Sequence, residues 1–252
     1  MSKNSSNTSQ YETTVKLPSK GILYEGVPED VTLRAMTTND EKIIFGSTTP
    51  NAVSKILQRC IVTPEDLNIS KLTPADESYL LLKLRTHTYG SDYPIVGHCP
   101  ECGASNTYDI NLDELPVTYL SDDFTEPFDI TLPVSEDTLS VRLLRNHDYT
   151  QIRSQAKKIA KKLRANVKEL EFIYRMAKYI VKLNGEDIDQ VKAQEYVSNL
   201  VGKDSAYFFW KINQIANFGV DTTSTVICKD CGEEFDLPFE INSEFFRPKF
   251  DE

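Results

Sequence analysis

Two cysteine pairs constrain the fold of this chain more than any other feature of its sequence. Cys99 and Cys102 form one C-x-x-C-G motif, and Cys228 and Cys231 form another. Two residues between the cysteines allow a tight turn that directs both thiolates toward one ion, and the following glycine accepts a positive φ. Two such turns complete a tetrahedral four-thiolate zinc site with Zn–S bonds of about 2.3 Å. The sequence therefore predicts that both pairs share one structural Zn²⁺ ion.

The distance between the two pairs along the chain departs from that of an ordinary zinc ribbon. Ribbons separate their pairs by roughly 15–20 residues, whereas 125 residues lie between Cys102 and Cys228. Two topologies remain open: a ribbon with a domain-sized insertion, or two knuckles that pseudo-two-fold symmetry brings together. The second topology is the simpler one, because equivalent elements of the two halves then meet on the symmetry axis.

Other roles for the cysteines fit the sequence less well. Disulfides are not expected, because the chain begins with a polar segment and not with the apolar core of a secretory signal. A redox pair would accompany a thioredoxin-like βαβ pattern, which the sequence lacks. His98 could replace one ligand, although a place in the flanking strand is the simpler interpretation. Cys60 falls on an apolar helix face and is expected to be a packed core thiol.

The two halves of the chain share an order of motifs that predicts an internal duplication. VTLRAMTTNDEKII at 31–44 aligns with LSVRLLRNHDYTQI at 139–152. In each half, nine positions separate a glycine, Gly90 or Gly219, from the first cysteine of the motif. Single matches of this kind also arise between unrelated segments, and it is their shared order that favours duplication. We expect an α+β fold with pseudo-two-fold symmetry, in which each half supplies a β-hairpin, a helical layer and one CxxC knuckle to a shared, zinc-ribbon-like four-cysteine site.

The expected organisation has four parts. They are a disordered N-terminal arm at 1–13, a first half-repeat at 14–115, a second half-repeat at 128–242 and an aromatic C-terminal tail at 243–252. The arm is rich in Ser, Asn and Thr and lacks apolar periodicity. Apolar residues at helical spacing predict helices near 51–61, 74–88, 147–165, 168–183, 189–201 and 204–218.

Charge is unevenly distributed along the chain. The net charge is −10, yet residues 146–183 contain ten basic and three acidic residues, a local charge of +7 that leaves −17 elsewhere. A solvated helix face would explain this pattern, and so would a docking surface for an acidic partner or for another copy's acidic face. Nucleic acid is not favoured, because aromatic residues do not interleave with the basic ones. Under the docking interpretation, the contact residues are Lys157, Lys158, Lys161 and Lys162.

The C-terminal sequence EINSEFFRPKFDE carries three phenylalanines with little local structure to bury them. Pro248 disfavours helical backbone at the residue before it. Phe245, Phe246 and Phe250 therefore either pack back on the protein's own core or insert into the groove of a partner. In the second case they are partner-binding residues.

The sequence lacks the motifs that support common enzymatic reactions. There is no GxGxxG, GxxxxGK[ST], HExxH or GxSxG. The carboxylates are spread along the chain, and His87 and His147 are isolated. The chain contains no run of about 18 apolar residues, so the sequence predicts no transmembrane helix. We expect a protein without catalytic activity and without a membrane partner.

The stretches LPSKGILYEG and VTLRAMTTNDEKIIFGS resemble the T-even-type bacteriophage baseplate family, which includes hub subunits and hub-assembly proteins. The CPECG and CKDCG knuckles and the terminal FFRP agree with this resemblance, which covers about residues 15–248. It implies a scaffold that helps to build the central hub of a contractile tail, with hub or tape-measure proteins as partners and self-association as a further option. The implied locations are the host cytoplasm during assembly and the virion tail baseplate.

A rival interpretation is a zinc-ribbon protein that binds nucleic acid. The sequence pI of about 4.9 opposes it, because phosphate binding requires a basic surface. Basic residues are also scarce around the knuckles, with none at 97–106 and only Lys229 at 226–236.

Overall fold

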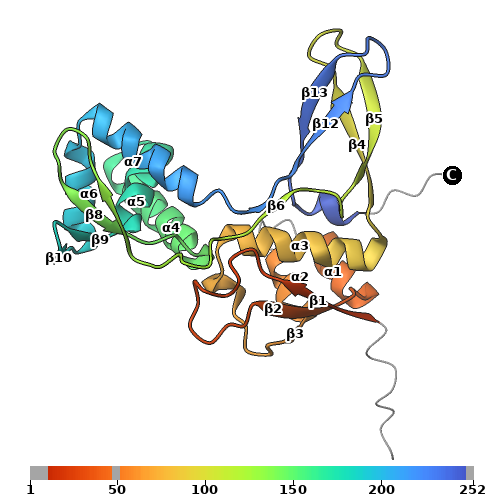
Figure 1. Cartoon of the computed structure of the whole chain (residues 1–252), viewed down its shortest axis with the longest axis horizontal. Helices are drawn as coiled ribbons and strands as arrows, with labels where there is room; N and C mark the ends of the chain where they lie inside the picture. Colours follow the sequence, from red (N-terminus) through yellow and green to blue (C-terminus); the bar gives the residue numbers. More distant parts are fainter. Residues whose placement is uncertain (1–10, 47–51, 248–252) are drawn as a thin grey trace, which may run out of the picture.

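The first of two α/β units lies at the N-terminal end of the chain (Figure 1). The structure is a computed structural model that describes residues 11–46 and 52–247. The unit has a three-stranded antiparallel sheet in the order β1–β2–β3, packed against helices. Its elements are β1 (Glu12–Lys16), β2 (Asp30–Arg34), α1 (Thr38–Gly46), α2 (Ala52–Cys60), β3 (Ile61–Thr63), η2 (Ile69–Lys71) and α3 (Pro74–Tyr89).

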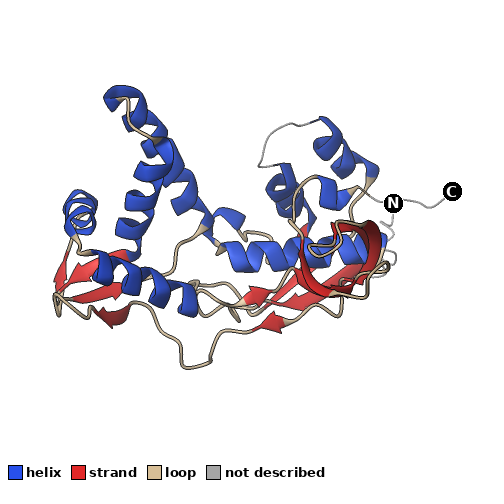
Figure 2. Cartoon of the chain, turned by 90° about the horizontal axis from the view of Figure 1, so that it is seen from above, coloured by secondary structure: helices blue, strands red, loops and turns tan. Residues whose placement is uncertain are grey.

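The second unit has a four-stranded antiparallel sheet in the order β10–β9–β8–β7. Figure 2 shows helices of both units rising from the same side of the molecule. The elements of this unit are β7 (Phe128–Thr131), β8 (Thr138–Val141), α4 (Asn146–Leu163), α5 (Val167–Tyr179), β9 (Ile180–Leu183), β10 (Glu186–Asp187), α6 (Gln190–Asn199) and α7 (Gly202–Ile215).

A β-ribbon made of two hairpins projects from the first unit (Figure 1). One hairpin pairs β4 (Asp92–His98) with β5 (Ser105–Asn111), and the other pairs β12 (Thr223–Ile227) with β13 (Glu234–Pro238). The two hairpins come from opposite halves of the sequence. At their base, β6 (Val117–Thr118) pairs with β11 (Gly219–Val220), and the C-terminal segment ends in η3 (Glu244–Phe246).

Each unit has its own hydrophobic core, built from alternate strand residues and one face of each helix. Val31 and Leu33 of β2 are both fully buried, as the alternation of the sequence predicts. Leu139 and Val141 of β8 are fully buried in the same way. The fold is therefore a mixture of helices and small sheets organised around two cores.

The two units arrange their elements in the same order. In each, a β-hairpin is followed by two helices and then by a strand that pairs with the second strand of the hairpin. The pairing of that last strand is irregular in both units, between Thr32 and Leu33 in one and between Ser140 and Val141 in the other. A later helix, α3 or α7, then leads to the ribbon.

In both units an ion pair between a half-buried arginine and a buried aspartate joins the sheet to the first helix. Arg34 donates to the two carboxylate oxygens of Asp40 over 2.8 and 3.3 Å. Arg142 donates to those of Asp148 over 2.8 and 2.9 Å. Each arginine also donates to the carbonyl of the residue that follows it. Each pair therefore clamps a strand end against a helix start.

These contacts keep both buried carboxylates ionised at neutral pH. Burial alone would raise the pKa of Asp40, but hydrogen bonds, the strongest of them from Arg34, outweigh burial and hold that pKa far below its usual range. For Asp148, burial is likewise outweighed, chiefly by hydrogen bonds from Arg142 and from the backbone N–H of Arg145, so its pKa is also lowered. An aspartate whose pKa is lower in the folded state than in the unfolded chain stabilises the fold at pH values above its unfolded pKa. This stability is lost as the pH falls through its folded pKa.

Two boundaries differ from those that the sequence predicts. The helix expected over 168–183 ends at Tyr179, and Ile180–Leu183 instead forms strand β9, because it completes the sheet beside β8. The arm expected at 1–13 falls largely outside the described residues. Its last two residues, Glu12 and Thr13, already belong to β1 and pair with Arg34 and Leu33.

For Phe245 and Phe246 the structure supports the first alternative, packing on the protein's own core, and corrects their assignment as partner-binding residues. Both belong to η3, and they are 0% and 2% exposed in the core of the first unit. Asn242 supplies the local structure, because its side chain accepts the backbone N–H groups at the start of η3. Arg85 donates to the carbonyl of Phe245 over 3.1 Å. Phe250 lies outside the described residues.

We predict that Arg34→Met and Arg142→Met each lower the free energy of unfolding by about 3 kcal/mol, because each leaves a buried aspartate without its main partner. Urea denaturation at neutral pH measures this. Lys83→Met is the control, since its partner Asp113 is exposed and the pair should contribute less than about 1 kcal/mol. If neither substitution lowers the free energy of unfolding more than Lys83→Met does, the Arg–Asp pairs are not needed for stability.

We predict that Phe245→Ala and Phe246→Ala each cost about 3–5 kcal/mol of folding stability, because they open cavities in a packed core. Phe209→Ala is the matched control, since Phe209 is 38% exposed. Thermal and urea unfolding provide the measurement. Unchanged unfolding combined with weaker partner capture would return these two residues to a docking role.

Candidate metal centre

Each CxxC motif forms the tight turn at the tip of one ribbon hairpin. The N–H of Cys99 donates to the carbonyl of Ala104 over 2.9 Å, and the N–H of Gly103 donates back to the carbonyl of Cys99 over 3.0 Å. The second turn repeats both bonds, from Cys228 to Glu233 over 2.7 Å and from Gly232 to Cys228 over 3.0 Å. The glycines have φ of +73° and +80°, the left-handed region that favours glycine.

The structure brings all four sulfur atoms together, within 4.8 Å of one another. The Sγ atoms of Cys99 and Cys231 lie 3.6 Å apart, and those of Cys102 and Cys228 lie 3.7 Å apart. A disulfide needs about 2.05 Å, so the four thiols are free. A tetrahedron with Zn–S bonds of about 2.3 Å has sulfur atoms about 3.8 Å apart. The closest sulfur pairs therefore fit a four-thiolate metal site.

The second turn favours the thiolate form of one cysteine, Cys228, whereas the pKa values of Cys102 and Cys231 are raised where the four thiols crowd together. The backbone N–H groups of Cys231 and Asp230 lower the pKa of the Cys228 thiol to about 6. One cysteine of each pair is buried, Cys99 and Cys228, and the other is exposed at the tip of the ribbon. All four donors are protein thiols, which is the composition of a closed structural site and not of a catalytic site with an open position.

Contacts between the two hairpins hold the turns in register below the sulfur atoms. The Asn106 amide donates to Asp230 over 2.8 Å, and the Lys229 ammonium donates to the Thr107 carbonyl over 2.6 Å. The rings of Tyr108 and Phe235 meet edge to face with centroids 5.9 Å apart. These polar and aromatic contacts each cross from one half of the sequence to the other, so the ribbon is an interface between the halves.

Close packing between the hairpins continues at Gly97, where a Cβ atom would lie 3.0 Å from the Leu237 side chain.

His98 is exposed and pairs with Ser105 in the β4–β5 ladder, as its interpretation as a strand residue predicts. Cys60 is also as predicted: it is fully buried in the first core, away from the cluster, and burial raises the pKa of its thiol to about 12.

The four lysines expected to bind a partner all lie exposed on α4, in the second unit and not in the ribbon. Of these, only Lys157 lines a groove between the two units; Lys158, Lys161 and Lys162 do not. Lys55 and Lys168 face the same groove, and the sequence analysis did not single them out. They lie 113 positions apart in the chain, and no local pattern connects them.

Comparison with protein-family models finds a match to the family described as T4 bacteriophage base plate protein over residues 8–247, nearly the whole chain. Comparisons with curated proteins and with solved structures find no significant match. Within the described ranges, no helix is long and apolar enough to cross a membrane. The resemblance drawn from the sequence is confirmed, and the chain belongs to the T4 bacteriophage base plate protein family.

Proposed function

We propose that this baseplate protein is a non-enzymatic scaffold of the tail hub, either a hub subunit or a hub-assembly factor, whose two halves are stapled by one structural Zn²⁺ ion. The convergence of four thiols from opposite halves of the chain carries this proposal. Membership of a baseplate family supports a structural role and partners among other baseplate proteins. The specific partners proposed are hub or tape-measure proteins, met in the host cytoplasm during assembly and retained, in the case of a subunit, in the virion baseplate.

Zinc at Cys99, Cys102, Cys228 and Cys231 would act on stability and shape. The ion would close a loop that spans about half of the chain, and loop closure of this kind stabilises the folded state. An isolated two-stranded hairpin is marginally stable in water. The ribbon contains two such hairpins with a thin layer of side chains between them, and a metal would secure the end farthest from the core of the first unit.

We further propose that the halves arose by duplication. Besides the shared order of elements and the Arg–Asp clamp, a second buried aspartate recurs, in the first turn of α3 and of α7. Asp76 accepts the backbone N–H of Ser19 over 3.0 Å, and Asp204 accepts that of Val134 over 2.8 Å. Ser19 and Val134 each follow a Leu-Pro pair. Equivalent contacts at equivalent positions support a common origin for the halves.

The rival nucleic-acid function receives no support from the surroundings of the knuckles. Lys229, the one basic residue near the cysteines, already donates to the Thr107 carbonyl. Acidic residues follow it in the chain, at Asp230, Glu233 and Glu234. A phosphate backbone would meet repulsion at this tip.

We predict one zinc ion per chain in protein purified without a metal-binding tag. Cys99→Ser should reduce the content below half an equivalent and lower the melting temperature, because three thiolates no longer complete the site. Cys60→Ala is the control and should retain one equivalent, since this buried thiol lies outside the cluster. Plasma mass spectrometry and thermal unfolding measure both effects. Metal-free wild-type protein that melts at the same temperature with and without a chelator would contradict the proposal.

We predict that replacing Lys157, Lys158, Lys161 and Lys162 by Gln slows the capture of hub proteins from phage-infected lysate and flattens its salt dependence. Exposed charges around an interface act mainly on the association rate. A control with the same change in charge replaces four exposed lysines elsewhere: Lys42, Lys71, Lys192 and Lys203. Each protein is immobilised on a surface, the rate at which it captures lysate proteins is followed, and the captured proteins are identified by mass spectrometry. Capture of no hub or tape-measure protein by the wild type would refute the scaffold role.

A further inference from the structure

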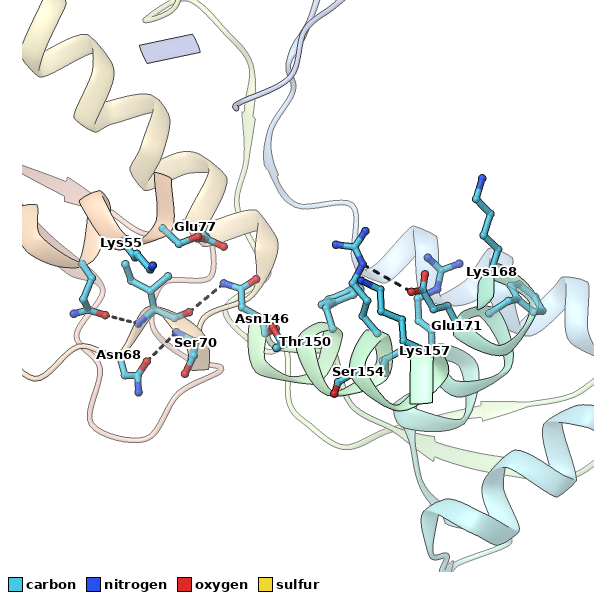
Figure 3. Close-up of a pocket in the computed structure, with 18 residues that line it drawn as sticks. Lys55, Asn68, Ser70, Glu77, Asn146, Thr150, Ser154, Lys157, Lys168 and Glu171 are labelled. Atoms are coloured by element: carbon cyan, nitrogen blue, oxygen red, sulfur yellow. Dashed lines mark hydrogen bonds and ion pairs between the residues drawn. The ribbon is translucent and has the colours of Figure 1, made fainter. Parts of the chain in front are cut away.

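An open groove with a volume of about 1130 Å³ lies between the two units (Figure 3). Residues of α2, η2 and the start of α3 form its wall in the first unit, and residues of α4 and α5 form its wall in the second. The groove is separate from the cysteine cluster, and the metal site proposed above makes no use of it. Its volume corresponds to roughly two to three turns of an α-helix about 10 Å wide.

The lining of this groove is predominantly basic. Two carboxylates line it, and one of them, Glu171, already lies 3.9 Å from the Arg153 guanidinium. Burial raises the pKa of the other, Glu77, which disfavours its charged form. Among the described residues, Lys157 and Lys168 have no ion pair. The five basic residues of the lining are Lys55, Arg153, Lys157, Lys168 and Arg175.

Two aromatic side chains in the groove are also incompletely covered. Tyr149 of α4 is 37% exposed and Phe172 of α5 is 39% exposed. The Phe172 ring lies 6.3 Å from the ring of Phe209, which continues the aromatic surface onto α7. Exposed aromatic surface beside unpaired cations favours an occupant that is both apolar and acidic.

Hydrogen bonds join the two units beside the groove. The backbone N–H of Asn146 donates to the carbonyl of Leu72 over 2.9 Å, and the His147 ring contacts the Ser70 carbonyl over 2.9 Å. Arg145 reaches the carbonyl of Leu23 over 2.9 Å. Because these bonds hold the two walls in place, an occupant would bind a preformed site and would lose little free energy in ordering it.

We propose that this groove binds an acidic amphipathic helix of a partner protein. The helix would direct carboxylates to Lys55, Lys157 and Lys168 and apolar side chains to Tyr149 and Phe172. The charge of −17 outside residues 146–183 repels a long phosphate backbone, so a short acidic helix is favoured over a nucleic acid. The proposal rests on the scaffold function proposed above and narrows its docking site to the side of α4 that carries Lys157.

The test uses the purified full chain and a fluorescent synthetic peptide of about four helical turns, with Glu on one face and Leu on the other. Fluorescence anisotropy measures its Kd. Lys157→Glu with Lys168→Glu should weaken binding at least about tenfold, since both charges face the helix. Lys158→Glu with Lys162→Glu adds the same charge outside the groove and should weaken binding less than about threefold. All four positions are exposed, so thermal unfolding should be the same in both variants.

Three results would overturn the proposal. Equal losses in the two double variants would show general attraction to a basic surface. Tighter binding of single-stranded DNA than of the peptide would assign the groove to nucleic acid. The third result is that the chain self-associates in sedimentation experiments and that the double variant Lys157→Glu with Lys168→Glu abolishes this self-association. That result would assign the groove to a second copy of the chain. If hub proteins are still captured in the lysate assay, each of these results removes the groove assignment and leaves the scaffold function standing.

Discussion

A buried carboxylate between strand and helix is the interaction on which each α/β unit depends. Asp40 and Asp148 are fully buried, and each is held by an arginine six residues earlier in the chain. A buried charge without a partner is strongly destabilising, so the arginine, the end of its strand and the start of the following helix are fixed together. Because the helix start is fixed, the apolar face of the helix meets the sheet in one position, and the core forms around that contact.

The ribbon joins the two halves at a different place and by different forces. Tyr108 and Leu237 are buried in the ribbon, and Ile110 of β5 belongs to the core of the first unit. Toward the tip, hydrogen bonds cross between the hairpins and the four thiols converge. The C-terminal segment then returns to the first unit, where Phe245 enters the core and its carbonyl accepts a hydrogen bond from Arg85. The second half of the sequence is thus tied to the other hairpin at the tip of the ribbon and to the first unit at its base.

Charge divides the surface in a way that suits a protein that joins others. The basic residues concentrate on α4 and α5, while the rest of the chain is strongly acidic. Such a separation steers partners of opposite charge to defined faces and suppresses contact with like-charged ones. The hydrogen bonds of Arg145, Asn146 and His147 to the first unit hold the basic helices at a set position relative to α2 and η2. The groove between the units results from this arrangement.

The sequence by itself predicted the convergence of the cysteines, the inward faces of the strands and most helices, because these depend on residue type and short-range spacing. The tertiary structure alone decided three other features. Ile180–Leu183 is a strand because β8 offers it a free edge, and Phe245 is buried because the ribbon returns it to a distant core. Lys55 and Lys168 face one groove because Asn146 and its neighbours dock on η2. Contacts between residues far apart in sequence leave no periodic pattern in the chain, and only folding brings them together.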